Sequence, residues 1–174
     1  IASKDVFGMY SYTRFKTDTY FNINLKKVGG SILYFRLKTM ASNGTLPTQK
    51  YIGLTDDQPL YLNGLGDLST VFPENHNPRG WSGYRLGDRL FFGSIEYRMP
   101  IAPKALSLNL ITDFANAWWS DGKAKEDMVF TAGYELRFSL GPLVVAGGDA
   151  QLVEDWKNDK KPLRYYRLVL TTPF

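Results

Sequence analysis

The feature that most constrains this sequence is a strict alternation of apolar and polar residues over a stretch longer than an ordinary strand. Between residues 128 and 140 the odd positions are mostly polar, and the even positions are apolar or aromatic. The even positions are Met128, Phe130, Ala132, Tyr134, Leu136, Phe138 and Leu140. A period of two is typical of a β-strand, whose side chains point alternately to opposite faces. Soluble strands are usually about 5–6 residues long, whereas a membrane-crossing strand needs about 9–11. This stretch is therefore long enough to cross a bilayer.

The same alternation recurs along the chain and predicts about eight strands. It is clear in residues 21–25, 90–99, 106–118 and 166–174, and weaker in residues 6–16, 31–40 and 143–152. Short turns rich in Gly and Pro alternate with long connections, of which residues 43–89 are the longest. Short turns on one side and long loops on the other are typical of outer-membrane barrels. We therefore expect residues 1–174 to be an all-β, antiparallel transmembrane β-barrel segment, with residues 43–89 as an extracellular loop and the C-terminus in the periplasm.

Composition excludes several other classes of protein. Aromatic residues make up 15% of the chain, yet the mean hydropathy is −0.26. No apolar run approaches the roughly 20 residues of a membrane helix. The absence of cysteine excludes a disulfide scaffold and a thiolate metal site. The net charge of +4 is scattered, so we expect no nucleic-acid partner, and we predict no metal or cofactor site. The start at Ile1, without Met or signal peptide, indicates a mature chain or the C-terminal piece of a longer one.

Aromatic residues near the predicted strand ends fit a girdle at the membrane interface. The alternative is that they belong to the core of an ordinary β-sandwich. They are Tyr84, Tyr97, Trp118, Trp119, Tyr134, Tyr165 and Tyr166. The C-terminal stretch also ends in an aromatic residue preceded by alternate apolar ones, which resembles the assembly signal of bacterial outer-membrane proteins. Its residues are Tyr166, Leu168, Leu170 and Phe174.

Four segments in order carry a family resemblance. Residues 77–88 contain Asn-Pro-Arg-Gly-Trp and Tyr-Arg-Leu-Gly-Asp, and residues 93–100 read Gly-Ser-Ile-Glu-Tyr-Arg-Met-Pro. Residues 112–118 read Thr-Asp-Phe-Ala-Asn-Ala-Trp, and residues 139–143 read Ser-Leu-Gly-Pro-Leu. In combination they resemble the BamA/TamA and two-partner-secretion transporter superfamily, also called the bacterial surface antigen family, over residues 46–174. Two positions depart from that pattern, because Ala115 replaces a Gly and Trp81 replaces a Phe or Tyr.

The resemblance implies a lock between the long loop and the barrel lumen. By parity, Glu96 and Asp113 lie on the polar faces of their strands, where a carboxylate pair favours a cation. The resemblance supplies that cation as Arg79, whose planar fork can serve two carboxylates at once. Gly80 would allow the loop backbone to approach the wall closely, and Trp81 completes the motif. The alternative is an ordinary surface turn with two solvated carboxylates.

The family barrel has sixteen strands, so the resemblance implies that this chain is its C-terminal half. Unpaired edges are not tolerated in lipid, so we expect partner strands from a missing N-terminal half or from a second copy. The implied function is insertion of outer-membrane proteins, or movement of polypeptide or lipid across the bacterial outer membrane, without catalysis. Expected partners are outer-membrane lipids including lipopolysaccharide, outer-membrane protein substrates and periplasmic assembly factors.

Two alternatives stay open. One is a small stand-alone outer-membrane barrel, either a lipid-modifying enzyme or a structural, porin-like protein. An enzyme would need a nucleophile and a base, but the only histidine is His76 and no Gly-x-Ser-x-Gly motif is present. The other is a soluble barrel with a ligand cavity, in which the aromatic residues would face inwards.

Overall fold

The computed structural model describes residues 10–26, 29–47, 51–54, 60–63, 78–102, 105–122, 127–140, 143–158 and 160–170, with only the backbone at 60–63, 157 and 167–170. These residues form an all-β fold with one short 3-10 helix, η3 (Val153–Asn158). The long strands are β1 (Tyr12–Leu25), β2 (Ser31–Gly44), β6 (Arg89–Ala102), β7 (Leu106–Trp118), β8 (Val129–Leu140), β9 (Leu143–Leu152) and β10 (Leu163–Leu170). The short strands are β3 (Ile52–Leu54), β4 (Leu60–Asn63) and β5 (Arg85–Gly87). No helix among the described residues is long and apolar enough to span a membrane.

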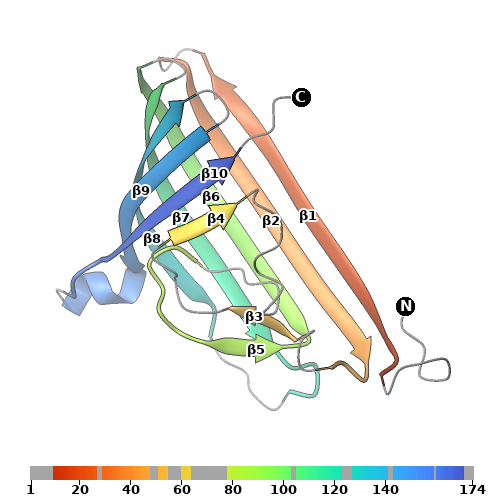
Figure 1. Cartoon of the computed structure of the whole chain (residues 1–174). Helices are drawn as coiled ribbons and strands as arrows, with labels where there is room; N and C mark the ends of the chain where they lie inside the picture. Colours follow the sequence, from red (N-terminus) through yellow and green to blue (C-terminus); the bar gives the residue numbers. More distant parts are fainter. Residues whose placement is uncertain are drawn as a thin grey trace.

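One large sheet contains all seven long strands in the order β1-β2-β6-β7-β8-β9-β10-β4. Each long strand is antiparallel to the next, whereas β4 pairs with β10 in parallel. The sheet is curved, and its long strands are tilted (Figure 1). In the described part of the chain the sheet is not closed, because β1 and β10 are not paired with each other.

The large sheet of the described residues has eight strands, as many as the sequence predicts, but two of its segments differ from the expectation. Residues 6–16 and 21–25 were expected to give two strands, but β1 runs without interruption from Tyr12 to Leu25 and pairs with β2 along its whole length. The intervening residues 17–20 contain no Gly or Pro, so nothing there ends the strand. The connection at residues 43–89 also differs from a plain loop, because it contains β3, β4 and β5.

The two faces of the sheet have the polarity expected from the alternation. On the outer face Leu136 and Phe138 of β8 are 47% and 44% exposed, while on the inner face Glu96 and Asp113 are 4% and 1% exposed. Other outer-face side chains that are exposed are Phe15, Phe21, Ile23, Leu37, Ile95, Leu110, Phe130, Leu140 and Val145. Many apolar side chains are thus exposed on the outer face while Glu96 and Asp113 are buried on the inner one, which is the reverse of a soluble sheet. It is also the reverse of a ligand-binding barrel with its aromatic residues inside.

An apolar cluster fills one end of the inner face. Met40, Leu90 and Phe92 of the wall pack there with Ile52 of β3 and with Trp81. The β3–β5 pair lies at this end of the sheet (Figure 1) and contacts β7. This packing holds the segment that leads from Pro78 into β5 and β6 against the inside of the sheet.

One of the expected girdle aromatics was placed on the wrong face. Tyr165 is 1% exposed and packs on the inner face with Ile111 and Ala150. Its neighbour Tyr166 lies on the outer face and is half exposed, as is Tyr134 of β8, while Tyr84 is exposed in the segment before β5. Adjacent residues of a strand point to opposite faces, so Tyr165 and Tyr166 cannot both belong to a girdle.

Candidate functional site

A turn at Pro78–Trp81 brings Arg79 to the inner face of the sheet. Gly80 has φ of 80°, a left-handed conformation that favours glycine, and the Trp81 amide donates a hydrogen bond to the Pro78 carbonyl at 3.3 Å. A Cβ at position 80 would overlap the backbone of Ala150 and Gln151 in β9. The turn therefore lies directly against the wall, and the packing of Trp81 in the apolar cluster fixes it there.

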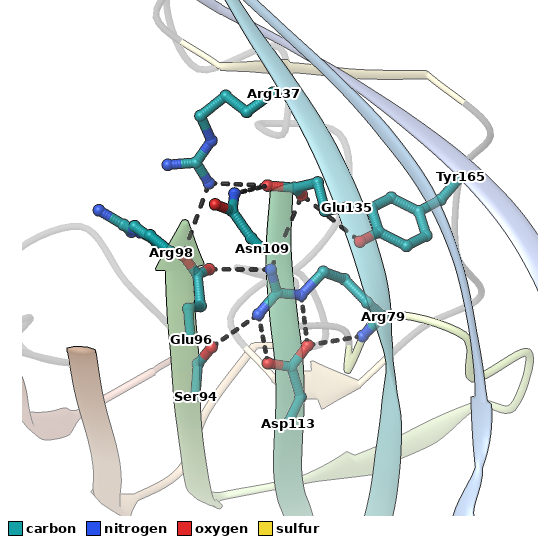
Figure 2. Close-up of polar contacts among 9 residues, drawn as sticks. All are labelled: Arg79, Ser94, Glu96, Arg98, Asn109, Asp113, Glu135, Arg137 and Tyr165. Atoms are coloured by element: carbon teal, nitrogen blue, oxygen red, sulfur yellow. Dashed lines mark hydrogen bonds and ion pairs between the residues drawn. The ribbon is translucent and has the colours of Figure 1, made fainter. Parts of the chain in front are cut away.

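The guanidinium of Arg79 binds side chains from two neighbouring strands (Figure 2). Its Nε and Nη2 donate to the two carboxylate oxygens of Asp113 at 2.7 and 2.6 Å, and its backbone amide donates to Oδ2 at 2.9 Å. Its Nη1 donates to Glu96 at 2.8 Å, and Nη2 also donates to the Ser94 hydroxyl at 2.7 Å. The structure thus brings together Arg79, Glu96 and Asp113, and Gly80 and Trp81 hold the turn that positions the arginine.

A third carboxylate, Glu135 of β8, was not identified from the sequence. It is fully buried, and its Oε2 lies 3.7 Å from Nη1 of Arg79. The Asn109 amide donates to Glu135 at 3.2 Å, and the Tyr165 hydroxyl donates to it at 3.4 Å. Glu135 occupies an odd position in the alternating stretch 128–140, and this position alone assigns its side chain to the polar face. The missing information was the register, which places Asn109 opposite Glu135.

Two further arginines complete the cluster. Arg98 donates from Nε to Glu96 at 2.7 Å, and Arg137 donates from Nη2 to Glu135 at 2.8 Å. Together with Arg79 they provide three positive charges against the three negative charges of Glu96, Asp113 and Glu135. We call these six residues the inner charge cluster. It is electrically balanced, as a buried group of charges must be if it is to be stable.

Arg79 is charged in this environment. Burial lowers its pKa, but the charge of Asp113 and its hydrogen bonds, together with Glu96 and Glu135, more than offset burial and hold the pKa well above its usual value. The contacts of Arg79 are therefore true ion pairs. They tie one turn of the 43–89 connection to β6, β7 and β8 at the same time.

The inner charge cluster is suited to holding a segment in place. Each of its carboxylates has an arginine partner within the cluster, and Arg79 joins the turn to the wall. Among the described residues no group of three or more His, Cys, Asp or Glu side chains could hold a metal ion. His76 lies outside the described residues.

The residues of the expected C-terminal assembly signal are only partly described. Tyr166 is half exposed on the outer face of β10, and the backbone register pairs Leu168 with Val145 and Leu170 with Leu143. Phe174 lies outside the described residues. Comparisons with protein-family models, with curated proteins and with solved structures find no match to this chain.

Proposed function

We propose that this chain forms part of the wall of a bacterial outer-membrane barrel of the BamA type, which inserts outer-membrane proteins or moves polypeptide or lipid across that membrane. One observation carries the proposal: long strands expose apolar side chains on one face and bury a charge cluster on the other. In water, both features would cost free energy. Against lipid, the exposed face is favourable, and the buried cluster faces a lumen.

In this proposal the inner charge cluster is a lock. Arg79 fastens the 43–89 connection inside the barrel by joining Asp113 of β7 to Glu96 of β6. The lock stiffens the wall around β6–β8 and leaves motion to the edges of the sheet. β10 corresponds to the last strand of the resembled barrel, where a lateral seam would open towards lipid, and in this structure β4 pairs with the side of β10 that does not face β9.

The directions of β1 and β10, the first and last of the long strands, constrain how such a barrel would close. Six successive antiparallel pairings lead from β1 to β10, so these two strands run in the same direction. Bacterial single-chain barrels pair antiparallel throughout and have an even number of strands. The seven long strands among the described residues would therefore need an odd number of further strands. A second copy would place β10 parallel to β1, so the missing N-terminal part is the better partner.

The stand-alone barrel remains the alternative. It would require β1 to pair with β10 in parallel, and nothing among the described residues favours that pairing over a partner segment. Closure by a partner predicts that the chain expressed alone is unstable in detergent and that an added N-terminal barrel segment stabilises it. A chain that forms a heat-resistant barrel by itself would support the alternative.

Two experiments test the proposal. A cysteine replacing Lys160, in the β9–β10 connection, should react with an impermeant thiol reagent on whole cells, whereas a cysteine replacing Lys104 should react only after the outer membrane is opened. The reverse pattern would invert the orientation. Vesicles that contain the full-length protein should then accelerate insertion of an unfolded outer-membrane protein, and Arg79→Ala should slow that insertion. Equal rates with empty vesicles would reject the insertase function while leaving the barrel intact.

A further inference from the structure

A second polar cluster lies on the outer face of the sheet, away from Arg79. Tyr134, Asp149 and Arg164 are direct cross-strand neighbours on β8, β9 and β10. The Tyr134 hydroxyl donates to Oδ2 of Asp149 at 2.8 Å, and Nε of Arg164 donates to Oδ1 at 2.9 Å. A further N–H of Arg164 donates to Oδ2 at 3.4 Å. The three side chains thus form one connected row across the strands.

This row is surrounded by exposed apolar side chains. Phe130 lies on one side of Tyr134 along β8 and Leu136 on the other, and both are about half exposed. Val145 and Val153 lie on either side of Asp149 along the chain and are also exposed. Phe130 lies four residues from Tyr134 along β8, in the direction of the β7–β8 connection. At about 3.3 Å per residue the two are roughly 13 Å apart. Exposed apolar side chains of β8 therefore lie on both sides of the polar row.

The guanidinium of Arg164 is held but not covered. Its side chain is 69% exposed, whereas that of Asp149 is 14% exposed. A lone arginine on such a surface would bend towards water, but Asp149 and Tyr134 fix the direction of this one. Arginine has five N–H donors, and those not directed at Asp149 face the surroundings of the sheet. Lipid tails offer these donors no acceptor, whereas a phosphate group matches the fork of a guanidinium.

We infer that Arg164, held by Asp149 and Tyr134, binds the phosphate of a lipid headgroup against the outer wall of β8–β10. The inference rests on the proposed function, because only in a membrane does the outer face meet lipid. Asp149 lies three residues before the end of β9, and Arg164 is the second residue of β10. Both are thus close to the β9–β10 connection, which the proposed orientation places outside the cell. The ligand is accordingly a phosphorylated lipid of the outer leaflet.

The test compares lipids that differ only in phosphate. Purified full-length protein in a neutral detergent is titrated with bis-phosphorylated lipid A and with its dephosphorylated form, and binding is followed by native mass spectrometry. Wild-type protein should prefer the phosphorylated lipid. Arg164→Gln should weaken that binding by about tenfold, as expected for loss of a charged hydrogen bond, and should not change binding of the dephosphorylated lipid. Arg164→Lys, which keeps the charge but loses the fork, should bind with intermediate strength.

The chain supplies a matched control on the inner face. Arg36 pairs with Asp18 through Nε at 2.9 Å and Nη2 at 2.6 Å, the same two-bond geometry as the Arg164 pair. Arg36→Gln should leave lipid binding unchanged, and an equal loss in both variants would overturn the inference in favour of general charge attraction. Displacement of the lipid by millimolar inorganic phosphate would assign the site to a free anion instead. Membrane retention of wild-type protein after a urea wash is measured in parallel. Its loss would reject the proposed function, whereas retention without a phosphate preference would reject the lipid site alone.

Discussion

Nη2 of Arg79 lies 2.6 Å from Oδ1 of Asp113, although 34 residues separate the two in the chain. Arg79 belongs to a connection between strands, whereas Asp113 is in the middle of β7. The contact therefore joins a segment that could otherwise leave the sheet to a strand that cannot. Both side chains are buried, so little solvent screens the attraction between their charges.

Breaking this pair should lower stability in a non-additive way. Arg79→Ala and Asp113→Asn should each destabilise the fold by about 3–5 kcal/mol, because each removes one side of a buried ion pair. The double variant should cost little more than either single one. The measurement is the midpoint of thermal unfolding of the full-length protein in detergent. Fully additive losses would show that the two residues do not interact.

The exposed pair Arg36–Asp18 provides the comparison for this cycle. Its side chains are 39% and 31% exposed, so solvent screens the attraction. Arg36→Ala and Asp18→Asn should each cost about 0.2–1 kcal/mol, as is usual for surface pairs. If these variants lose as much stability as the Arg79 variant, any ion pair of the sheet has the same effect. The inner charge cluster would then have no special role in stability.

Glu135 should matter although it lies outside the resembled motif. Glu135→Gln removes the negative charge beside Arg137 and Arg79 while keeping the shape of the side chain. We expect a loss of about 1.5–3 kcal/mol, the usual range for hydrogen bonds to charged groups. Glu154→Gln, at an exposed position of η3, is the matched control and should change the free energy of unfolding by less than about 0.5 kcal/mol. Equal midpoints for the two variants would remove Glu135 from the cluster's energetics.

The contrast between Asp113 and Glu135 illustrates what the sequence could predict. Alternation assigned both to polar faces, since the side-chain period of a strand depends only on the chain itself. The resemblance supplied Arg79 as the partner of Asp113 and Glu96. Neither source contains the register between strands, and it is the register that sets Glu135 opposite Asn109 and close to Tyr165.

Long-range pairing also explains the errors in the fold. Residues 6–16 and 21–25 were separated because their alternation weakens between them, yet pairing with β2 maintains one strand throughout β1. The parallel pairing of β4 with β10 joins segments more than a hundred residues apart, which no local pattern can predict. The outer polar row is hidden for the same reason, because Tyr134, Asp149 and Arg164 look unrelated until the register aligns them.

Gly80 should be far less tolerant of substitution than a glycine of similar conformation. Gly80→Ala introduces a side chain at φ of 80° and also overlaps the backbone of Ala150 in β9. Gly122 has φ of 74° but nothing within 4 Å of an added Cβ. Gly122→Ala should therefore lower the free energy of unfolding only by the cost of a side chain in this conformation, about 1–2 kcal/mol. Gly80→Ala should lose more, and limited proteolysis should cleave the 43–89 connection faster in that variant. Equal losses would mean that close approach to β9 is unimportant.

Pairing between β4 and β10 should protect the edge of the sheet. Leu60–Asn63 align in parallel with Tyr166–Val169, so β4 occupies the β10 edge that an incoming strand would use. Leu62→Pro removes an amide donor and is incompatible with a paired strand. Hydrogen exchange measured by mass spectrometry should then accelerate for the β10 amides that face β4, while those that face β9 stay protected. Leu46→Pro, in the same connection but outside any strand, is the control and should leave exchange in β10 unchanged. If Leu62→Pro leaves exchange in β10 at the wild-type rate, β4 does not guard this edge in solution, and an incoming strand meets no competitor there.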